Sequence, residues 1–160
     1  MDKEISAIRQ RVRLGAERDR IHVETLTAAT VDSLRVELLS HNYDIIHFAG
    51  HADGDGLELL GDDGVHNLTF EAFGKMLAGQ ERLKCVVINA CSAMQGRSTA
   101  FAPLVIGMVD DIDDEEALVF AKGFYDALAA GQSPAKAYDI GVTALESEGL
   151  NQHIVAKMVS

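Results

Sequence analysis

Residues 84–93 read KCVVINACSA, and this stretch decides the fold of the chain. Val86, Val87 and Ile88 are β-branched and apolar without alternation, which is typical of a strand with both faces covered. Such strands occur in the middle of the parallel sheet of an α/β domain. The apolar run ends at Cys91, and ligands of open parallel sheets bind outside the carboxyl ends of the strands. We therefore expect Cys91 at the edge of the sheet where chemistry is usually done.

A second apolar run, Ile45 to Ala49, also stops abruptly, at Gly50 and His51. By the same rule, His51 is expected at the same edge of the sheet as Cys91. A histidine within hydrogen-bond reach of a thiol can take its proton or hold the thiolate as an ion pair, which is the basic arrangement of a cysteine nucleophile. Free cysteines are more often buried as small hydrophobes, and we expect Cys85, inside the strand, to be one. The pairing of the thiol with a histidine favours a catalytic dyad.

Strands and helices alternate along the chain. The N-cap residues Thr30, Thr69, Asp113 and Ser133 predict helix starts, and Glu116 completes a capping box with Asp113. Helices are predicted over residues 2–14, 31–42, 70–79, 114–128 and from 134 onward. Strands are predicted over residues 21–26, 45–49, 84–90, 104–108 and 152–159, with a small hairpin at 57–64. The alternation predicts a three-layer α/β/α sandwich with a mostly parallel sheet.

Length and charge limit the classes of protein that the chain can belong to. Its 160 residues fit one domain, and its apolar runs fall far short of the roughly 18 residues of a membrane span, so we expect a soluble protein. The first residues do not form a basic start followed by an apolar core, so we expect no signal peptide in them. Cys85 and Cys91 lie too far apart on one extended segment to bridge, and we expect two free thiols, as in the cytoplasm. The net charge of −11 argues against a nucleic-acid partner. Residues 1–20 hold six basic and four acidic residues, so the first helix either docks on the acidic rest of the chain, binds a partner or has a solvated face.

Two apparent metal sites lack the spacing that a metal ion requires. The loop that starts at Asp53 has Glu58 and Gly64 where a calcium loop needs glycine and glutamate. His47 and His51 would stand about 13 Å apart on a strand, too far for one zinc ion. We therefore expect no metal and no other cofactor.

Six carboxylates crowd residues 110–116, just past a predicted strand end. One interpretation is that they complement the positive end of the next helix. The other is that Asp110 or Asp111 lines a substrate-binding groove at the edge of the sheet. The sequence leaves both interpretations open.

The sequence resembles the CHAT domains, which belong to the caspase-like cysteine peptidases. The resemblance runs over nearly the whole chain, in the family's order. It is carried by HFAGHAD (47–53), Gly56 to Leu60 with Asp62 to Gly64, VVINACSA (86–93), VIGM (105–108) and FAKGFYDALAAGQSPAKAYDIG (120–141). It implies a caspase-like fold, with His51 as general base or acid and Cys91 as nucleophile. It also implies an oxyanion hole made by the backbone N–H groups of Ala52 and Cys91.

The sequence departs from the family pattern in three places. Ala52 stands where the family usually has glycine, and an alanine N–H can serve if its dihedral angles suit. Asn89 stands where the basic-specific relatives carry aspartate, so we expect it to contact substrate without confining cleavage to bonds after lysine or arginine. Family members usually begin with a strand, which is missing here. Either the boundary was cut inside a longer protein, or this copy lacks a strand that the fold normally has. We expect residues 1–160 to be a single CHAT domain and a piece of a larger protein.

The resemblance implies a cysteine endopeptidase that hydrolyses peptide bonds in a protein or peptide substrate. Such a domain is expected to be an effector of a bacterial signalling or defence protein, latent until a sensor or regulatory domain in the same or an associated chain activates it. The alternative is a catalytically silent CHAT domain that serves binding or regulation.

Overall fold

A computed structural model describes residues 2–90, 101–152 and 155–159. The chain divides into two compact units. One unit consists of residues 1–25 and 112–155, and the other of residues 26–111 and 156–160. The single domain over 1–160 remains a prediction, because the two units are separately compact.

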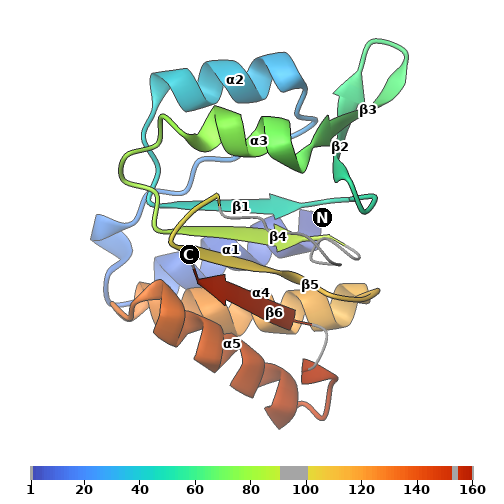
Figure 1. Ribbon diagram of the computed structural model, residues 1–160. Coiled ribbons are helices and arrows are strands. Elements are labelled where there is room, and N and C mark those ends of the chain that lie inside the picture. Colours follow the sequence, from blue (N-terminus) through green and yellow to red (C-terminus); the bar gives the residue numbers. More distant parts are fainter. Residues whose placement is uncertain (1, 91–100, 153–154, 160) are drawn as a thin grey trace. The chain divides into compact units, whose positions relative to one another are not determined.

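The second unit contains a sheet of four strands in the order β1-β4-β5-β6 (Figure 1). The strands are β1 (Ile45–Ala49), β4 (Cys85–Asn89), β5 (Leu104–Met108) and β6 (Val155–Val159). β4 pairs in parallel with β1 on one side and with β5 on the other. The predicted parallel sheet is therefore confirmed, with the strand at residues 85–89 in its interior.

Strand β4 has the burial that its composition predicts. Cys85, Val86, Val87 and Ile88 are all 0% exposed, so both faces of the strand are covered. Val86 and Ile88 point to one face, because successive side chains alternate, and they join a core with Phe73. A run of β-branched residues without alternation thus forms a strand that is covered on both sides.

Two helices of this unit, α2 (Val31–Ser40) and α3 (Phe70–Leu77), lie side by side over the strands (Figure 1). Both begin where the caps predict. The Thr30 side chain accepts a hydrogen bond from the Ser33 N–H in a capping box, and the Thr69 side chain accepts one from the Ala72 N–H. Each helix ends two residues before its predicted end, and at α2 the reason is that His41 already has an extended backbone.

Buried Gln80 connects α2 to the sheet. Its side-chain amide donates to the carbonyl oxygens of Leu38 (2.7 Å) and His41 (3.0 Å), and its side-chain oxygen accepts from the Tyr43 N–H (2.8 Å). The carbonyl groups at the end of a helix lack partners within the helix, so this side chain satisfies two of them. It also fixes the chain just before β1 begins.

The predicted hairpin is present as β2 (Gly56–Gly61) and β3 (Gly64–Thr69). The two strands are antiparallel and joined by a two-residue loop, Asp62 and Asp63, because Gly61 pairs with Gly64. Gly64 has a φ of +126°, a conformation in which glycine carries no steric penalty. Leu57, Leu59 and Leu68 are buried, so the hairpin belongs to the core of this unit.

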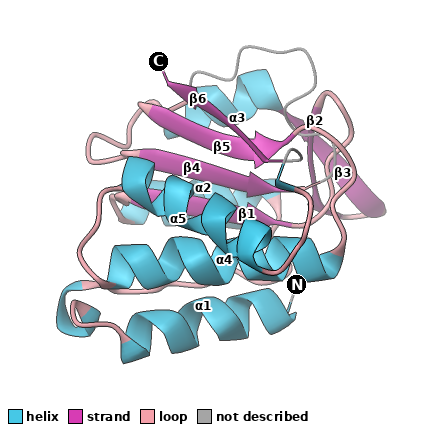
Figure 2. Ribbon diagram, turned by 90° about the horizontal axis from the view of Figure 1, so that it is seen from below, coloured by secondary structure: helices cyan, strands magenta, loops and turns pink. Residues whose placement is uncertain are grey.

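The first unit is built from α1 (Asp2–Leu14), the short 3-10 helix η1 (Arg18–Arg20), α4 (Asp114–Ala129) and α5 (Pro134–Ser147). Figure 2 shows α1 running beside α4. The α4 and α5 backbones approach closely, since a Cβ at Gly123 would lie 2.8 Å from the Ala144 Cβ. The caps Asp113, with Glu116, and Ser133 are both confirmed.

The prediction of a strand over Ile21–Leu26 is wrong. Exposure does alternate there, with half-buried Ile21 and Val23 between exposed neighbours, as in an extended segment with one covered face. Among the described residues, however, no strand pairs with the segment. Alternating side chains predict an extended backbone with a covered face, whereas a strand also needs a neighbouring backbone.

No helix in the described part of the chain has the length and apolar character needed to cross a bilayer.

Replacing Val87 with aspartate should unfold the protein. The change buries an unpaired carboxylate in β4, which should lower the free energy of unfolding by about 4 kcal/mol or more. Val65→Asp is the matched control, because Val65 is 70% exposed, and it should change the free energy of unfolding by less than about 0.5 kcal/mol. Thermal unfolding followed by circular dichroism measures both. Equal melting temperatures for the two variants would contradict the central place of β4.

Candidate active site

The carboxyl ends of three parallel strands meet at one edge of the sheet. Ala49 at the end of β1 is aligned with Asn89 at the end of β4, and Ile88 is aligned with Gly107 of β5. Beyond the ladder, the Gly50 N–H donates to the carbonyl of Asn89 (3.3 Å). The chain therefore leaves β1 and β4 at the same level, and the loops that follow start next to one another.

His51 lies two residues past the end of β1 and is exposed. Its carbonyl accepts a hydrogen bond from the Glu58 N–H (2.9 Å), while the Asp53 N–H donates to the carbonyl of Gly56 (3.1 Å). These two bonds flank an isolated antiparallel bridge between Ala52 and Leu57. The histidine is thus carried on a loop that is attached to the start of the hairpin.

Ala52 and Leu57 form a non-hydrogen-bonded pair in that bridge. In an antiparallel pair of this kind, the flanking residues form the hydrogen bonds and the central pair does not. Among the described residues, the Ala52 N–H accordingly has no hydrogen-bond acceptor. A backbone donor next to His51 therefore remains available for another oxygen atom.

The Asp53 side chain holds the loop after His51 in place. One carboxylate oxygen accepts from the N–H groups of Asp55 and Gly56 (3.0 Å each), and the other accepts from the Asn67 side chain (2.6 Å). Hydrogen bonds to the ionised form, the one from the Asp55 N–H first, lower the pKa of the Asp53 carboxyl. This role of Asp53 was not predicted from the sequence, although aspartate ahead of Gly-Asp-Gly is typical of such a turn.

The remaining predicted site residues stand at two strand ends. Asn89 is the last residue of β4 and is buried, with 6% of its surface exposed. Asp110 and Asp111 follow β5 and are exposed, and the Asp111 N–H donates to the Asp110 side chain (2.9 Å). The carboxylates of Asp113 and Glu116 belong to the start of α4, which fits the helix-dipole interpretation for this part of the acidic run. Asp110 and Asp111 lie ahead of that helix, beside the edge that carries His51.

Of the two cysteines, the structure describes only Cys85. Cys91 lies outside the described residues. Cys85 is free, 0% exposed and inside β4, and burial raises the pKa of its thiol to about 12. The prediction that Cys85 is a core residue is confirmed.

Within the described ranges, no three histidine, cysteine or acidic side chains gather as the ligands of a metal ion would.

The fold of the chain has a counterpart among solved structures. The chain is similar to a secreted C11 cysteine protease from Bacteroides thetaiotaomicron, solved by X-ray crystallography in complex with an irreversible peptide inhibitor. The TM-score is 0.59 and the identity 17%, over 81% of this chain and 44% of that chain. The present chain therefore spans less than half the length of this protease. The likeness confirms the predicted fold class, the α/β fold of caspase-like cysteine proteases.

A family model of the CHAT domain matches residues 1–139. The chain belongs to the CHAT domain family, as the motifs around residues 47–53 and 86–93 predict. A search of curated proteins gives no match.

Gly56→Ala should disturb the loop that carries His51. A Cβ at residue 56 would lie 2.2 Å from the carbonyl oxygen of Leu68 and 2.3 Å from the Asn67 side chain, so the hairpin must shift. We expect a loss of about 1–3 kcal/mol in the free energy of unfolding and a change in the NMR signals of the His51 ring. Gly54→Ala is the control, because a Cβ there has no atom within 4 Å. Equal effects of the two substitutions would show that the fit at residue 56 does not position the loop.

Proposed function

We propose that the domain is a cysteine endopeptidase in which Cys91 is the nucleophile and His51 is its acid and base. The observation that carries the proposal is the parallel register of β1 and β4. Ala49 and Asn89 are paired, and in the sequence His51 follows Ala49 by the same two residues by which Cys91 follows Asn89. Neighbouring strands lie about 4.8 Å apart, which is within the combined reach of a cysteine and a histidine side chain.

The reaction follows from these roles. The thiolate of Cys91 attacks the carbonyl carbon of the scissile bond and forms a tetrahedral intermediate. Protonated His51 gives its proton to the leaving amine as the C–N bond breaks, which leaves a thioester. A water molecule, deprotonated by His51, then attacks the thioester, the C–S bond breaks to return the Cys91 thiolate, and the acid product is released. The dyad is restored, and one peptide bond and one water molecule are consumed.

The oxyanion of both intermediates needs two donors that no other group uses. The Ala52 N–H fits the first, because the described residues offer it no acceptor. Its place on a loop fixed by Asp53 supports a donor that is oriented before substrate arrives. The Cys91 N–H is the proposed second donor. An alanine in place of the usual glycine is compatible with this role, because the donor is the backbone.

We place the substrate-binding groove at the edge of the sheet formed by the carboxyl ends of the strands. There Asn89, Asp110 and Asp111 would contact the substrate. Asn89 can donate to or accept from a substrate side chain but cannot neutralise a cation. Asp110 and Asp111 are solvated carboxylates, and water and salt screen their effect on a bound residue. Cleavage is therefore not restricted to bonds after lysine or arginine.

The setting that we propose is an effector domain of a bacterial signalling or defence protein in the cytoplasm. Peptidase activity in such a protein would stay latent until a sensor or regulatory domain, in the same or an associated chain, binds its trigger. The substrate would be a protein or a peptide.

Iodoacetamide should modify Cys91 much faster than Cys85. A thiol with a pKa of about 12 is ionised in about one molecule in 10⁴ or fewer near neutral pH, whereas a thiol beside an imidazole is activated. Peptide mapping by mass spectrometry after timed alkylation gives both rates, and a denatured sample shows that both peptides are detected. If Cys85 reacted as fast as Cys91 in the folded protein, the assignment of the nucleophile would be wrong.

A library of internally quenched peptides, varied at the residue before the cut, tests both the activity and its selectivity. The wild-type chain, with any regulatory domain it requires, should cleave members with several different residues at that position. Cys91→Ala and His51→Ala should each abolish cleavage, a loss of about 10³-fold or more, while both proteins keep the wild-type melting temperature. Undiminished cleavage by Cys91→Ala would refute the proposed nucleophile. Absence of cleavage by the wild type under activating conditions would favour a silent binding module.

A further inference from the structure

A hollow in the first unit collects arginine side chains. It has a volume of about 400 Å³ and lies between α1, η1 and the extended segment that follows η1. Its lining comes from residues 9–23 alone, so it belongs to one unit: Arg9, Val12, Arg13, Arg18, Asp19, Ile21 and Val23. The residues that line it thus give three positive charges and one negative charge.

The arginines of the hollow differ from their neighbours in how they are paired. Arg11 forms an ion pair with Asp126 (3.4 Å) and Arg20 forms one with Glu17 (2.9 Å), and neither of these arginines lines the hollow. In the described part of the chain, Arg9, Arg13 and Arg18 form no ion pair with a carboxylate.

Two of these three arginines form hydrogen bonds to neutral groups only. Arg9 donates to the Thr25 hydroxyl (2.7 Å), and Arg18 donates to the carbonyl of Gly15 (3.4 Å). In a chain with a net charge of −11, three guanidinium groups around one hollow, none of them ion-paired with a described carboxylate, are an unusual concentration of positive charge.

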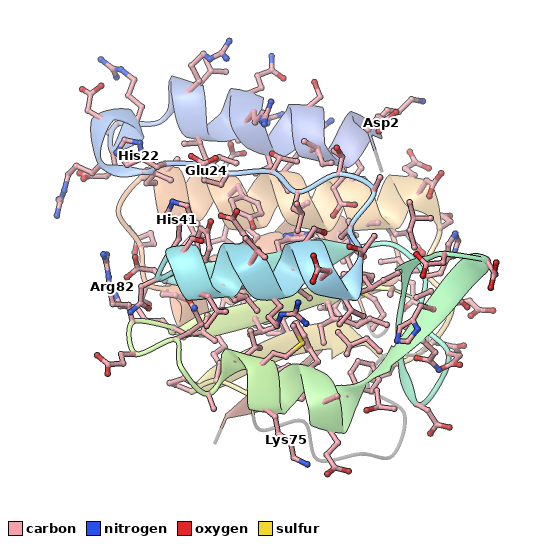
Figure 3. The ribbon with its side chains drawn as sticks, turned by 90° about the horizontal axis from the view of Figure 1, so that it is seen from above. Asp2, His22, Glu24, His41, Lys75 and Arg82 are labelled. Atoms are coloured by element: carbon pink, nitrogen blue, oxygen red, sulfur yellow. The ribbon has the colours of Figure 1, made fainter. Side chains whose placement is uncertain are left out.

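The walls between the arginines are apolar, and they come from helix α1 and from the extended segment after η1. Val12 is 5% exposed, and Ile21 and Val23 are half-buried on the segment whose predicted strand is absent. The backbone groups of residues 21–27 form no hydrogen bonds with other described backbone groups. His22 and Glu24, labelled in Figure 3, alternate with the lining residues and are exposed. An extended backbone without a partner next to an apolar wall can accept a second extended chain.

We propose that this hollow binds an acidic, extended peptide segment of a partner protein. Its carboxylates would occupy the guanidinium forks of Arg9, Arg13 and Arg18, which match carboxylate geometry in pairs of hydrogen bonds. Its alternate aliphatic side chains would contact Val12, Ile21 and Val23. A nucleic acid fits less well. A long chain of phosphates extends beyond the hollow and is repelled by the rest of this chain, whose net charge is −11, whereas a short peptide stays at the hollow.

The test is a binding measurement on the full chain carrying Cys91→Ala, so that its outcome does not depend on peptidase activity. The probe is a fluorescein-labelled peptide of alternating glutamate and valine, followed by fluorescence anisotropy. We expect saturable binding that weakens as salt rises, and no comparable binding of the same peptide with glutamine in place of glutamate. Binding of the glutamine peptide with equal affinity would overturn the proposal.

Arg13→Gln and Arg20→Gln form a matched pair, because both remove one positive charge from an exposed position of the same unit. Arg13→Gln should weaken binding of the glutamate peptide about fivefold or more, and Arg20→Gln less than about twofold. Equal losses would show attraction by net charge alone and overturn the proposal. So would tighter binding of oligothymidylate that displaces the peptide, which would identify a phosphate polymer as the ligand. Circular dichroism melts of both variants confirm that each remains folded.

Discussion

The parallel pairing of β1 with β4 is the interaction on which the candidate site depends. β4 is buried on both faces, so its backbone groups must find partners in the strands on either side, and β1 is one of them. Once the hydrogen bonds between β1 and β4 have set the register, the segments that follow the two strands leave the sheet at the same level, at Gly50 and Ala90. The Gly50 N–H still bonds to the Asn89 carbonyl, so the alignment continues beyond β1. A shift of register by one residue would turn every β4 side chain to the opposite face and would separate the two loops.

The His51 loop combines a fixed backbone with an available donor. Its flanking N–H and carbonyl groups are bonded to the start of β2, and the Asp53 carboxylate accepts three more hydrogen bonds. The Ala52 N–H has no acceptor among the described residues, because Ala52 and Leu57 form a non-hydrogen-bonded pair and the flanking residues form the hydrogen bonds. A rigid support around one unused donor is what stabilisation of a developing negative charge requires, since no reorganisation is needed when the charge forms.

The sequence predicts well those features that arise from local physics. Caps at Thr30, Thr69, Asp113 and Ser133 are confirmed, because a cap involves only a side chain and an N–H three residues on. Strand β4 is confirmed, because a short run of β-branched residues without alternation favours a strand whose two faces are both covered. The parallel sheet is confirmed as well, but several other features that depend on distant partners were missed or wrong.

Three examples give the physical reason. Ile21–Leu26 alternates as a strand does, yet the pattern contains no information on whether another backbone lies beside it. The role of Asp53 depends on Asn67, which the hairpin brings back from fourteen residues further on. The first helix is visibly basic, but Arg11 is neutralised by Asp126, which is 115 residues away, while Arg13 is not. Composition therefore indicates a charged helix and leaves open which charges are available to a ligand.

In the proposed peptidase, the chemistry of Asn89 would link the fold to selectivity. Asn89 is only 6% exposed, so an aspartate at this position would be a desolvated charge, costly in the free protein and compensated only when a cationic substrate residue binds. Such a site discriminates strongly, because a neutral substrate residue would leave the buried charge unpaired. With asparagine, the empty site carries no such cost, and a neutral residue meets no comparable penalty. The negative charge at this edge instead belongs to Asp110 and Asp111, which are exposed and screened by water and salt. In the proposed peptidase, electrostatics at the carboxyl edge would thus bias which substrates approach, while the shape of the groove and its hydrogen bonds would decide which are cut.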